Sequence, residues 1–258
     1  MSIVSGSPPA APASMGGLSS AVEDLSVLSE MNSLRFDGSS YLSKTFGSGG
    51  DSTKWTYSFW FKKTRLAKDY WDWFFSNPTN AGLMIGYNGA NENYQLFGYD
   101  GASDNSGYPA SSSKMQLRDT GSWYHIIYTK NTTSGARRWR IFVNGVEDIN
   151  ETAETSTVNN NFNTAISHYI GCWYIDGSSN RRLNGYMANI HFIDGQALDA
   201  DSFGEWISDI WRPRPYTGDY GINGFHLDFA GENMVYDSNG KLTQVLDASS
   251  NDNHWTAH

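Results

Sequence analysis

The sequence of 258 residues predicts an all-β protein, built as a sandwich or a closed barrel. From residue 34 onward, apolar and polar residues alternate in short runs, and Asn, Asp or Gly ends each run. About ten such runs follow one another at a spacing of roughly 8 to 12 residues. No alternation of helical and strand patterns occurs, which argues against a parallel α/β sheet. Aromatic residues make up 15% and charged residues 17% of the chain, which excludes a charged disordered chain and a coiled coil.

Several runs along the chain are candidate strands. SLRFDGSSYLSKTF (33–46) predicts a strand, a tight turn at Asp37–Gly38 and a second strand. Asn144–Gly145 is the strongest short hairpin signal in the chain. The other candidate runs are WTYSFWFKK (55–63), DYWDWFFS (69–76), AGLMIGYNG (81–89), NYQLFGYDG (93–101), MQLRD (115–119), GSWYHIIYTKN (121–131), ARRWRIFVNGVED (136–148), ISHYIGCWYIDGSS (166–179) and RRLNGYMANIHFIDGQALD (181–199).

The two ends of the chain differ from this central part. The first 17 residues are rich in Ser, Pro, Ala and Gly, and a capping box at Ser20 and Glu23 predicts one short helix after them. Near the C-terminus, GFHLDFAG and KLTQVLD predict two further strands. We therefore expect an arm and short helix over 1–33, a β-sandwich over 34–200, and a C-terminal β extension over 201–258 that packs on the sandwich.

The net charge of −9 is concentrated at the two ends. Residues 1–34 carry −3, residues 35–198 carry +1, and residues 199–258 carry −7. A nucleic-acid partner is not expected, because phosphate binding needs a basic surface at domain scale. The single Cys172 excludes an intrachain disulfide. The first residues form no secretory signal, and no run of about 18 apolar residues occurs, so we expect synthesis in a host cytoplasm without membrane insertion.

The order of the motifs is more specific than any one of them. The FDG opening strand, WTYSFW, WYH, VNG, and a closing NGYMANIHF that runs on to an Ala-Leu turn follow one another in this sequence. In this order they resemble the concanavalin A-like lectin/glucanase superfamily, in its laminin G-like branch, over about residues 34–200. The resemblance implies an antiparallel jelly roll of two packed sheets.

A narrower resemblance covers residues 192–258. FIDGQALDADSFGEW, the strand GFHLDF, and the stretch from Asp247 to Thr256 are similar to structural proteins of marine tailed bacteriophages, although GENMVYDSNGKLTQVL separates the two halves. The resemblance implies a structural surface protein of a virion, either a capsid decoration or a head fibre. Because the first 17 residues have too little apolar surface to fold alone, we expect residues 1–33 to contact capsid or appendage proteins. A homo-oligomer and a host-surface glycan are further expected partners. Alternative functions are a tail fibre or receptor-binding protein, a carbohydrate-binding module, and a glycan-active enzyme.

Catalysis is not expected. Glucanases of the superfamily use two carboxylates in an E-x-D-x-x-E strand, and none of the eight Glu residues is followed by Asp at the second position. G-x-S-x-G, phosphate-binding and H-E-x-x-H motifs are also absent. A glycosidase that uses another pair of acids remains an open alternative.

Glycan binding would require exposed aromatic rings that stack on sugar faces. Strand alternation places Trp71 and Trp73 on one face and Tyr70 and Asp72 on the other. The alternative for each ring is a place in the sandwich core, because most aromatic residues must fill it. The candidate glycan-binding residues are Trp71, Trp73, Tyr94, Tyr99, Trp173 and Tyr174.

Calcium is the expected metal, if any is bound. Many relatives in the superfamily bind it through Asp and Asn oxygens near loop ends. The candidate ligands are Asp100, Asp104, Asn105 and Asp176. The alternative is an ordinary turn, which the same residue types form.

Overall fold

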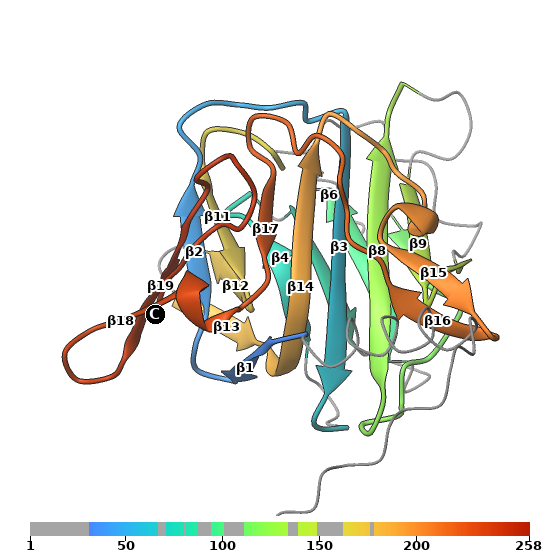
Figure 1. The fold of residues 1–258 in the computed structure, drawn as a ribbon, viewed down its shortest axis with the longest axis horizontal. Coiled ribbons are helices and arrows are strands. Elements are labelled where there is room, and N and C mark those ends of the chain that lie inside the picture. The colour runs from blue at the N-terminus through green and yellow to red at the C-terminus, as the bar shows by residue number, and fades with distance from the viewer. Residues whose placement is uncertain are drawn as a thin grey trace, which may run out of the picture. The chain divides into compact units, whose positions relative to one another are not determined.

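The computed structural model describes residues 31–66, 71–79, 81–86, 94–100, 111–133, 139–148, 162–175 and 178–258. These residues form two packed β-sheets in which every strand pairing is antiparallel (Figure 1). The predicted all-β jelly-roll sandwich is therefore confirmed. The arm and helix predicted before residue 31 lie outside the described residues. In the described part of the chain, no helix is long and apolar enough to cross a membrane.

Sheet A forms one layer of the sandwich, and its strands β14, β3 and β8 run side by side across Figure 1. In spatial order it consists of β1 (Ser33–Asp37), β14 (Asn184–Asp194), β3 (Lys54–Lys63), β8 (Trp123–Asn131), β9 (Trp139–Val143) and β10 (Val146–Glu147), and β17 (Phe225–Leu227) also pairs with β14.

Sheet B forms the second layer. In spatial order it consists of β18 (Met234–Tyr236), β19 (Leu242–Val245), β20 (Trp255–Ala257), β2 (Leu42–Thr45), β11 (Ser167–Ile170), β4 (Asp72–Ser76), β5 (Ala81–Gly86), β6 (Gln95–Asp100) and β7 (Ser111–Ser112).

Two separate hairpins accompany the sheets. One joins β12 (Cys172–Ile175) to β13 (Ser178–Arg182), and the other joins β15 (Gly204–Ile207) to β16 (Ile210–Pro213). The described residues also contain two short 3-10 helices, η2 (Ala200–Ser202) and η3 (Gly231–Asn233).

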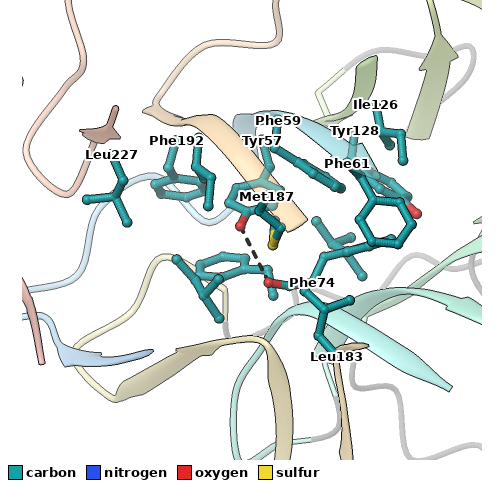
Figure 2. Packing of buried hydrophobic residues seen from close by; sticks show 14 of the residues in the cluster. Tyr57, Phe59, Phe61, Phe74, Ile126, Tyr128, Leu183, Met187, Phe192 and Leu227 are labelled. Carbon is teal, nitrogen blue, oxygen red and sulfur yellow. Dashed lines mark hydrogen bonds between the residues drawn. The ribbon is translucent and has the colours of Figure 1, made fainter. Parts of the chain in front are cut away.

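Aromatic side chains from the inner faces of both sheets fill the core (Figure 2). Period-two alternation in β3 directs Tyr57, Phe59 and Phe61 inward, and all three are fully buried. The Tyr57 hydroxyl donates to the backbone oxygen of Phe74 in the opposite sheet at 3.4 Å. Burying each such ring contributes about 1.5–3 kcal/mol, so the aromatic content of the chain mainly serves the core.

The strand, tight turn and second strand predicted over residues 33–46 are confirmed, but the two strands do not pair with each other. The turn is present, with Gly38 at φ +88°, and the Asp37 carboxylate accepts hydrogen bonds from the backbone and hydroxyl groups of Ser39 and Ser40. However, β1 pairs with β14 in sheet A, whereas β2 pairs with β11 and β20 in sheet B. The turn therefore connects the two layers. Which sheet each strand joins depends on strands that are distant in the sequence.

The hairpin predicted at Asn144–Gly145 is confirmed. Both residues have positive φ, 49° and 80°, as a two-residue type I′ turn requires, and Val143 pairs with Val146 across it. The Asn144 side chain also accepts a hydrogen bond from the backbone N–H of His125 at 2.8 Å. This contact ties the turn to the neighbouring strand β8.

The C-terminal residues pair with both sheets. β17 lengthens sheet A beside β14, and β20 pairs with β2 in sheet B. The Asp247 carboxylate accepts the backbone N–H groups of His226, Ser249 and Asn253, at 2.8, 2.8 and 2.9 Å. Trp255 is fully buried in the core. The polar pattern from Asp247 to Trp255 therefore has a structural role: it fastens the last strand to the sandwich.

Candidate functional site

An aromatic patch lies on the outer face of sheet B, away from the core. Neighbouring residues in β4, β5 and β6 belong to the core cluster, so alternation directs the patch residues to the opposite face. We define the aromatic patch by its members Trp71, Trp73, Met84, Phe97, Tyr99 and Trp173. Trp73, Met84 and Phe97 form a buried base, and the other three rings are half-buried. The patch therefore offers partly exposed aromatic surface on a rigid base.

The local sequence explains how the rings lie flat on the sheet. A register shift between Trp73 and Phe75 turns Trp73 outward while Phe74 and Phe75 both face the core. In β5, Gly82 lies beneath Trp73 and Gly86 lies beneath Trp71, and a methyl group on either glycine would overlap the ring above it. The two glycines thus allow the indoles to pack directly on the backbone.

The hairpin β12–β13 adds the outer layer of the patch. The indole of Trp173 stacks on that of Trp73, with ring centroids 5.0 Å apart and planes 16° apart. The guanidinium carbon of Arg181 lies 4.8 Å from the centre of the Trp173 ring and 5.9 Å from that of Trp71. Trp173 therefore stacks on Trp73, and the exposed Arg181 lies near the rings of both Trp173 and Trp71.

The polar groups of the patch can act as hydrogen-bond donors. Burial raises the pKa of the Tyr99 hydroxyl to about 12, and the positive charge of Arg181 partly opposes this shift. Tyr99 is therefore protonated at neutral pH and able to donate. The indole N–H groups of Trp73 and Trp173 are buried and have no hydrogen-bond partner in the described structure, so the donors at half-buried or exposed positions are the Tyr99 hydroxyl and the Arg181 guanidinium. Apolar ring faces beside a few polar donors are typical of a small-molecule or sugar site.

The structure brings together four of the predicted glycan-binding residues, Trp71, Trp73, Tyr99 and Trp173. Tyr94 lies apart, because its ring packs against the main core and carries the ammonium of Lys63 at 4.7 Å. Tyr174 belongs to β12, but its side chain is outside the described residues. Sequence reasoning missed Met84, Phe97 and Arg181. Met84 and Phe97 could have been found from alternation, whereas nothing in the sequence pairs Arg181 with Trp173.

The predicted calcium ligands are not brought together in the described structure. Asp104, Asn105 and Asp176 lie outside the described residues, and Asp100 ends β6 with its side chain also outside them. Among the described residues, no group of three or more His, Cys, Asp or Glu side chains is placed to hold a metal ion.

A buried carboxylate in β4 has a structural role. Asp72 faces Lys63 at 3.8 Å and Arg65 at 3.3 Å, and it accepts the backbone N–H of Asn184 at 3.2 Å. It thereby joins the ends of both sheets. Cys172 is also buried, which raises the pKa of its thiol to about 12 and keeps it in the unreactive protonated form.

The outer face of sheet A is closed by the chain itself. We call residues 196–222 the covering segment; its side chains Leu198, Phe203, Trp211, Tyr216 and Tyr220 pack on this face. Beneath it, the Trp211 indole donates to Nδ1 of His125 at 2.9 Å. Nδ1 of His191 lies 2.9 Å from the hydroxyl of Tyr220. The aromatic patch on sheet B is therefore the more open of the two outer faces.

The sandwich topology and the outer aromatic patch together define a lectin-like β-sandwich. A family model described as the concanavalin A-like lectin/glucanases superfamily matches residues 36–202, which is more than half of the chain. The chain belongs to this superfamily.

Proteins of known structure include chains similar to this one. A Bacteroides ovatus protein provisionally assigned to carbohydrate binding is 16% identical with a TM-score of 0.61, over 89% of this chain and 58% of that one. A pentraxin of Limulus polyphemus is 17% identical with a TM-score of 0.46, over 64% and 76% of the two chains. Tailspike protein 2 of an Escherichia coli O157:H7 bacteriophage is 11% identical with a TM-score of 0.40, over 69% and 24%. No curated protein sequence matches this chain.

Proposed function

We propose that the chain is a glycan-binding, lectin-like domain and that the aromatic patch is its binding site. The observation that carries the proposal is the grouping of three half-buried rings, Trp71, Tyr99 and Trp173, on the open face of sheet B. Sugar rings present flat apolar C–H faces, which pack on aromatic rings, while the surrounding hydroxyls take hydrogen bonds. The superfamily membership and the shared fold with the Bacteroides ovatus protein support this function.

The architecture of the patch suits recognition without rearrangement. Trp73, Met84 and Phe97 are at most 4% exposed and hold the outer rings in place. A site supported by packed side chains loses little conformational entropy on binding. The Tyr99 hydroxyl and the Arg181 guanidinium would supply the polar contacts that give a sugar its orientation.

Binding to a glycan array followed by isothermal titration with the best ligand tests the proposal. Trp173→Ala and Trp71→Ala should each weaken binding at least tenfold, because one lost stacked ring costs about 0.5–1.5 kcal/mol beyond its lost contact area. Trp206→Ala is the matched control, since Trp206 is 54% exposed on the β15–β16 hairpin. An array without ligands, or equal losses in all three variants, would contradict the proposal.

The chain would bind glycans without cleaving them. The support is the absence of the E-x-D-x-x-E strand from the sequence. Incubation with the array ligands should release no reducing ends. Release that is lost on replacing one Asp or Glu would establish an enzyme instead.

We further propose that the domain is displayed on a bacteriophage virion, as a capsid decoration or head fibre, where it meets host-surface glycans. The resemblance of residues 192–258 to phage structural proteins and the composition of residues 1–17 support this role. Residues 1–33 would contact capsid or appendage proteins. Deleting residues 2–17 should leave the sandwich folded and abolish attachment to the particle, which electron microscopy of the particle would reveal; normal incorporation would refute the anchoring role.

Calcium remains a separate proposal for the loops that carry Asp100, Asp104, Asn105 and Asp176. A calorimetric titration should then show heat and a higher melting temperature. Neither effect would appear if these residues only form turns.

A further inference from the structure

We propose that the glycan bound at the aromatic patch is acidic and that Arg181 recognises its carboxylate. The proposal rests on the proposed function, because it names the ligand class of the same site. Three features of Arg181 carry the proposal: its place over the rings of Trp173 and Trp71, the backbone geometry that directs it there, and its exposed side chain.

The backbone directs Arg181 toward the patch at a conformational cost. Cys172 pairs with Arg182, but Trp173 pairs with Asn180, so Arg181 is the extra residue of a β-bulge. Its φ of +67° lies in the left-handed region, which is unfavourable for a residue with a β-carbon. Bulges re-aim side chains, and strained residues collect at functional sites. The bulge thus places the Arg181 guanidinium over the rings of Trp173 and Trp71.

The rings hold the guanidinium and leave its N–H groups available. Arg181 lies over Trp173 and Trp71, at 4.8 and 5.9 Å, close enough for cation–π attraction to both. Burial raises the pKa of the Tyr99 hydroxyl, and the positive charge of Arg181 acts in the opposite direction. A guanidinium that stacks on a ring points its donor edge outward, in the fork geometry that matches a carboxylate.

Other arginines of the sandwich are occupied by acceptors of the chain. Arg140 pairs with Glu147 at 3.0 Å and with Asp199, and Arg65 pairs with Asp72 at 3.3 Å. For Arg181, by contrast, no Asp or Glu of the described residues is an ion-pair partner, and its side chain is exposed. An exposed cation beside a sugar-stacking surface favours an anionic ligand, because the carboxylate would supply the missing partner.

The test compares an acid with its neutral counterpart on the full chain. The probes are oligogalacturonate and oligomannuronate, each with its methyl ester, so that only the charge differs. Wild type should bind at least one of the acids tenfold or more tightly than its ester, since a hydrogen bond between two charged groups is stronger than one to a neutral group. Raising the salt concentration should weaken the binding of the acid and leave that of the ester unchanged.

Two variants separate recognition of charge from support of the patch. Arg181→Gln should weaken binding of the acid tenfold or more and binding of the ester by a smaller factor, so that the two ligands bind about equally. Arg181→Lys should retain part of the preference, because it keeps the charge and loses the fork. Trp173→Ala should abolish binding of both probes, and near-ultraviolet circular dichroism of each variant checks that the ring stack is intact.

The outcomes distinguish this proposal from the proposed function. Equal binding of acid and ester, or equal loss of both in Arg181→Gln, would overturn the acidic ligand and leave glycan binding intact. Tighter binding of a heparin hexasaccharide than of every uronate would mean that Arg181 recognises a sulfate. That result would overturn the proposal that it recognises a carboxylate. An array without any ligand would remove both proposals.

Discussion

The two outer faces of the sandwich both carry aromatic side chains but differ in what lies on them. On sheet A, the covering segment 196–222 packs over the face and supplies hydrogen-bond partners to His125 and His191. On sheet B, the aromatic patch ends in half-buried rings and the exposed guanidinium of Arg181. The aromatic surface of sheet A thus stabilises the fold, whereas that of sheet B stays accessible.

This difference shows that aromatic content by itself does not identify a binding site. Trp211 and Trp173 each stack on their own sheet, yet only Trp211 has its indole N–H bonded within the described chain. The two faces differ in how they are covered, since residues 196–222 pack on sheet A whereas Trp71, Tyr99 and Trp173 on sheet B stay half-buried. Changes on the sheet A face should therefore affect folding, and changes on the sheet B face should affect binding.

The largest expected effect is loss of stability in acid. Burial lowers the pKa of His125 to about 3 and of His168 to about 4, and it lowers that of His191 well below 6.5. Their neutral forms persist in the folded protein, whereas the unfolded chain takes up protons below pH 6.5. The full stability is present above pH 6.5 and is lost as the pH falls toward the folded pKa values. Urea unfolding should show roughly 4 kcal/mol less stability at pH 5.5 than at pH 7.5.

The control for this prediction is the free energy of unfolding at pH 7.5 and at pH 8.5, which should differ little. No histidine belongs to the aromatic patch, so glycan affinity should stay constant over the pH range in which the protein remains folded. Equal stability at pH 5.5 and 7.5 would contradict the buried, neutral state of the three histidines.

Removing the main anchor of the covering segment should have the next largest effect. The Trp211 ring packs on Gly145 and Gly204 and donates to His125. Trp211→Ala should reduce the free energy of unfolding by about 3 kcal/mol. Trp206→Ala in the same hairpin should cost less than about 1 kcal/mol, because that ring is 54% exposed. Both variants should retain the glycan affinity of the wild type. Weaker glycan binding by folded Trp211→Ala protein would contradict the different roles of the two faces.

A small change beneath the patch should disturb both stability and binding. A methyl group at Gly82 would overlap the Trp73 ring, so Gly82→Ala should displace Trp73 together with the Trp173 ring stacked on it. We expect a cost of about 2 kcal/mol from overpacking, and glycan affinity at least tenfold lower by titration. Gly47→Ala, where no atom lies within 4 Å of the added methyl, is the control. Unchanged affinity in Gly82→Ala would show that the ring stack is not the site.

The smallest expected effect concerns a single hydrogen bond on the covered face. Oγ of Ser58 lies 2.9 Å from Nε2 of His125, and both groups are buried. Ser58→Ala should cost about 1 kcal/mol, because it leaves one imidazole nitrogen without its partner. Urea unfolding measures this loss, while titration should show unchanged glycan affinity. A weaker glycan affinity in Ser58→Ala would mean that the two faces are coupled.

The sequence predicted much of the fold and four of the seven residues that form the aromatic patch with Arg181. Period-two runs identified the inner faces of strands such as β3, and Asn144–Gly145 predicted its hairpin, because both signals are local. The same alternation placed Trp71 and Trp73 together. It did not exclude Tyr94, whose ring packs on the core and Lys63, since that contact crosses between the sheets.

Local alternation and turn chemistry by themselves determined that this chain is an all-β sandwich with an aromatic core. Only the tertiary structure decided that the turn at Asp37–Gly38 connects two sheets. It also decided that Trp173 meets Trp73 and that Arg181 meets Trp71, each about a hundred residues away. The physical reason is that strand pairing joins residues that are distant in sequence, and a single bulge decides which face a side chain such as Arg181 presents.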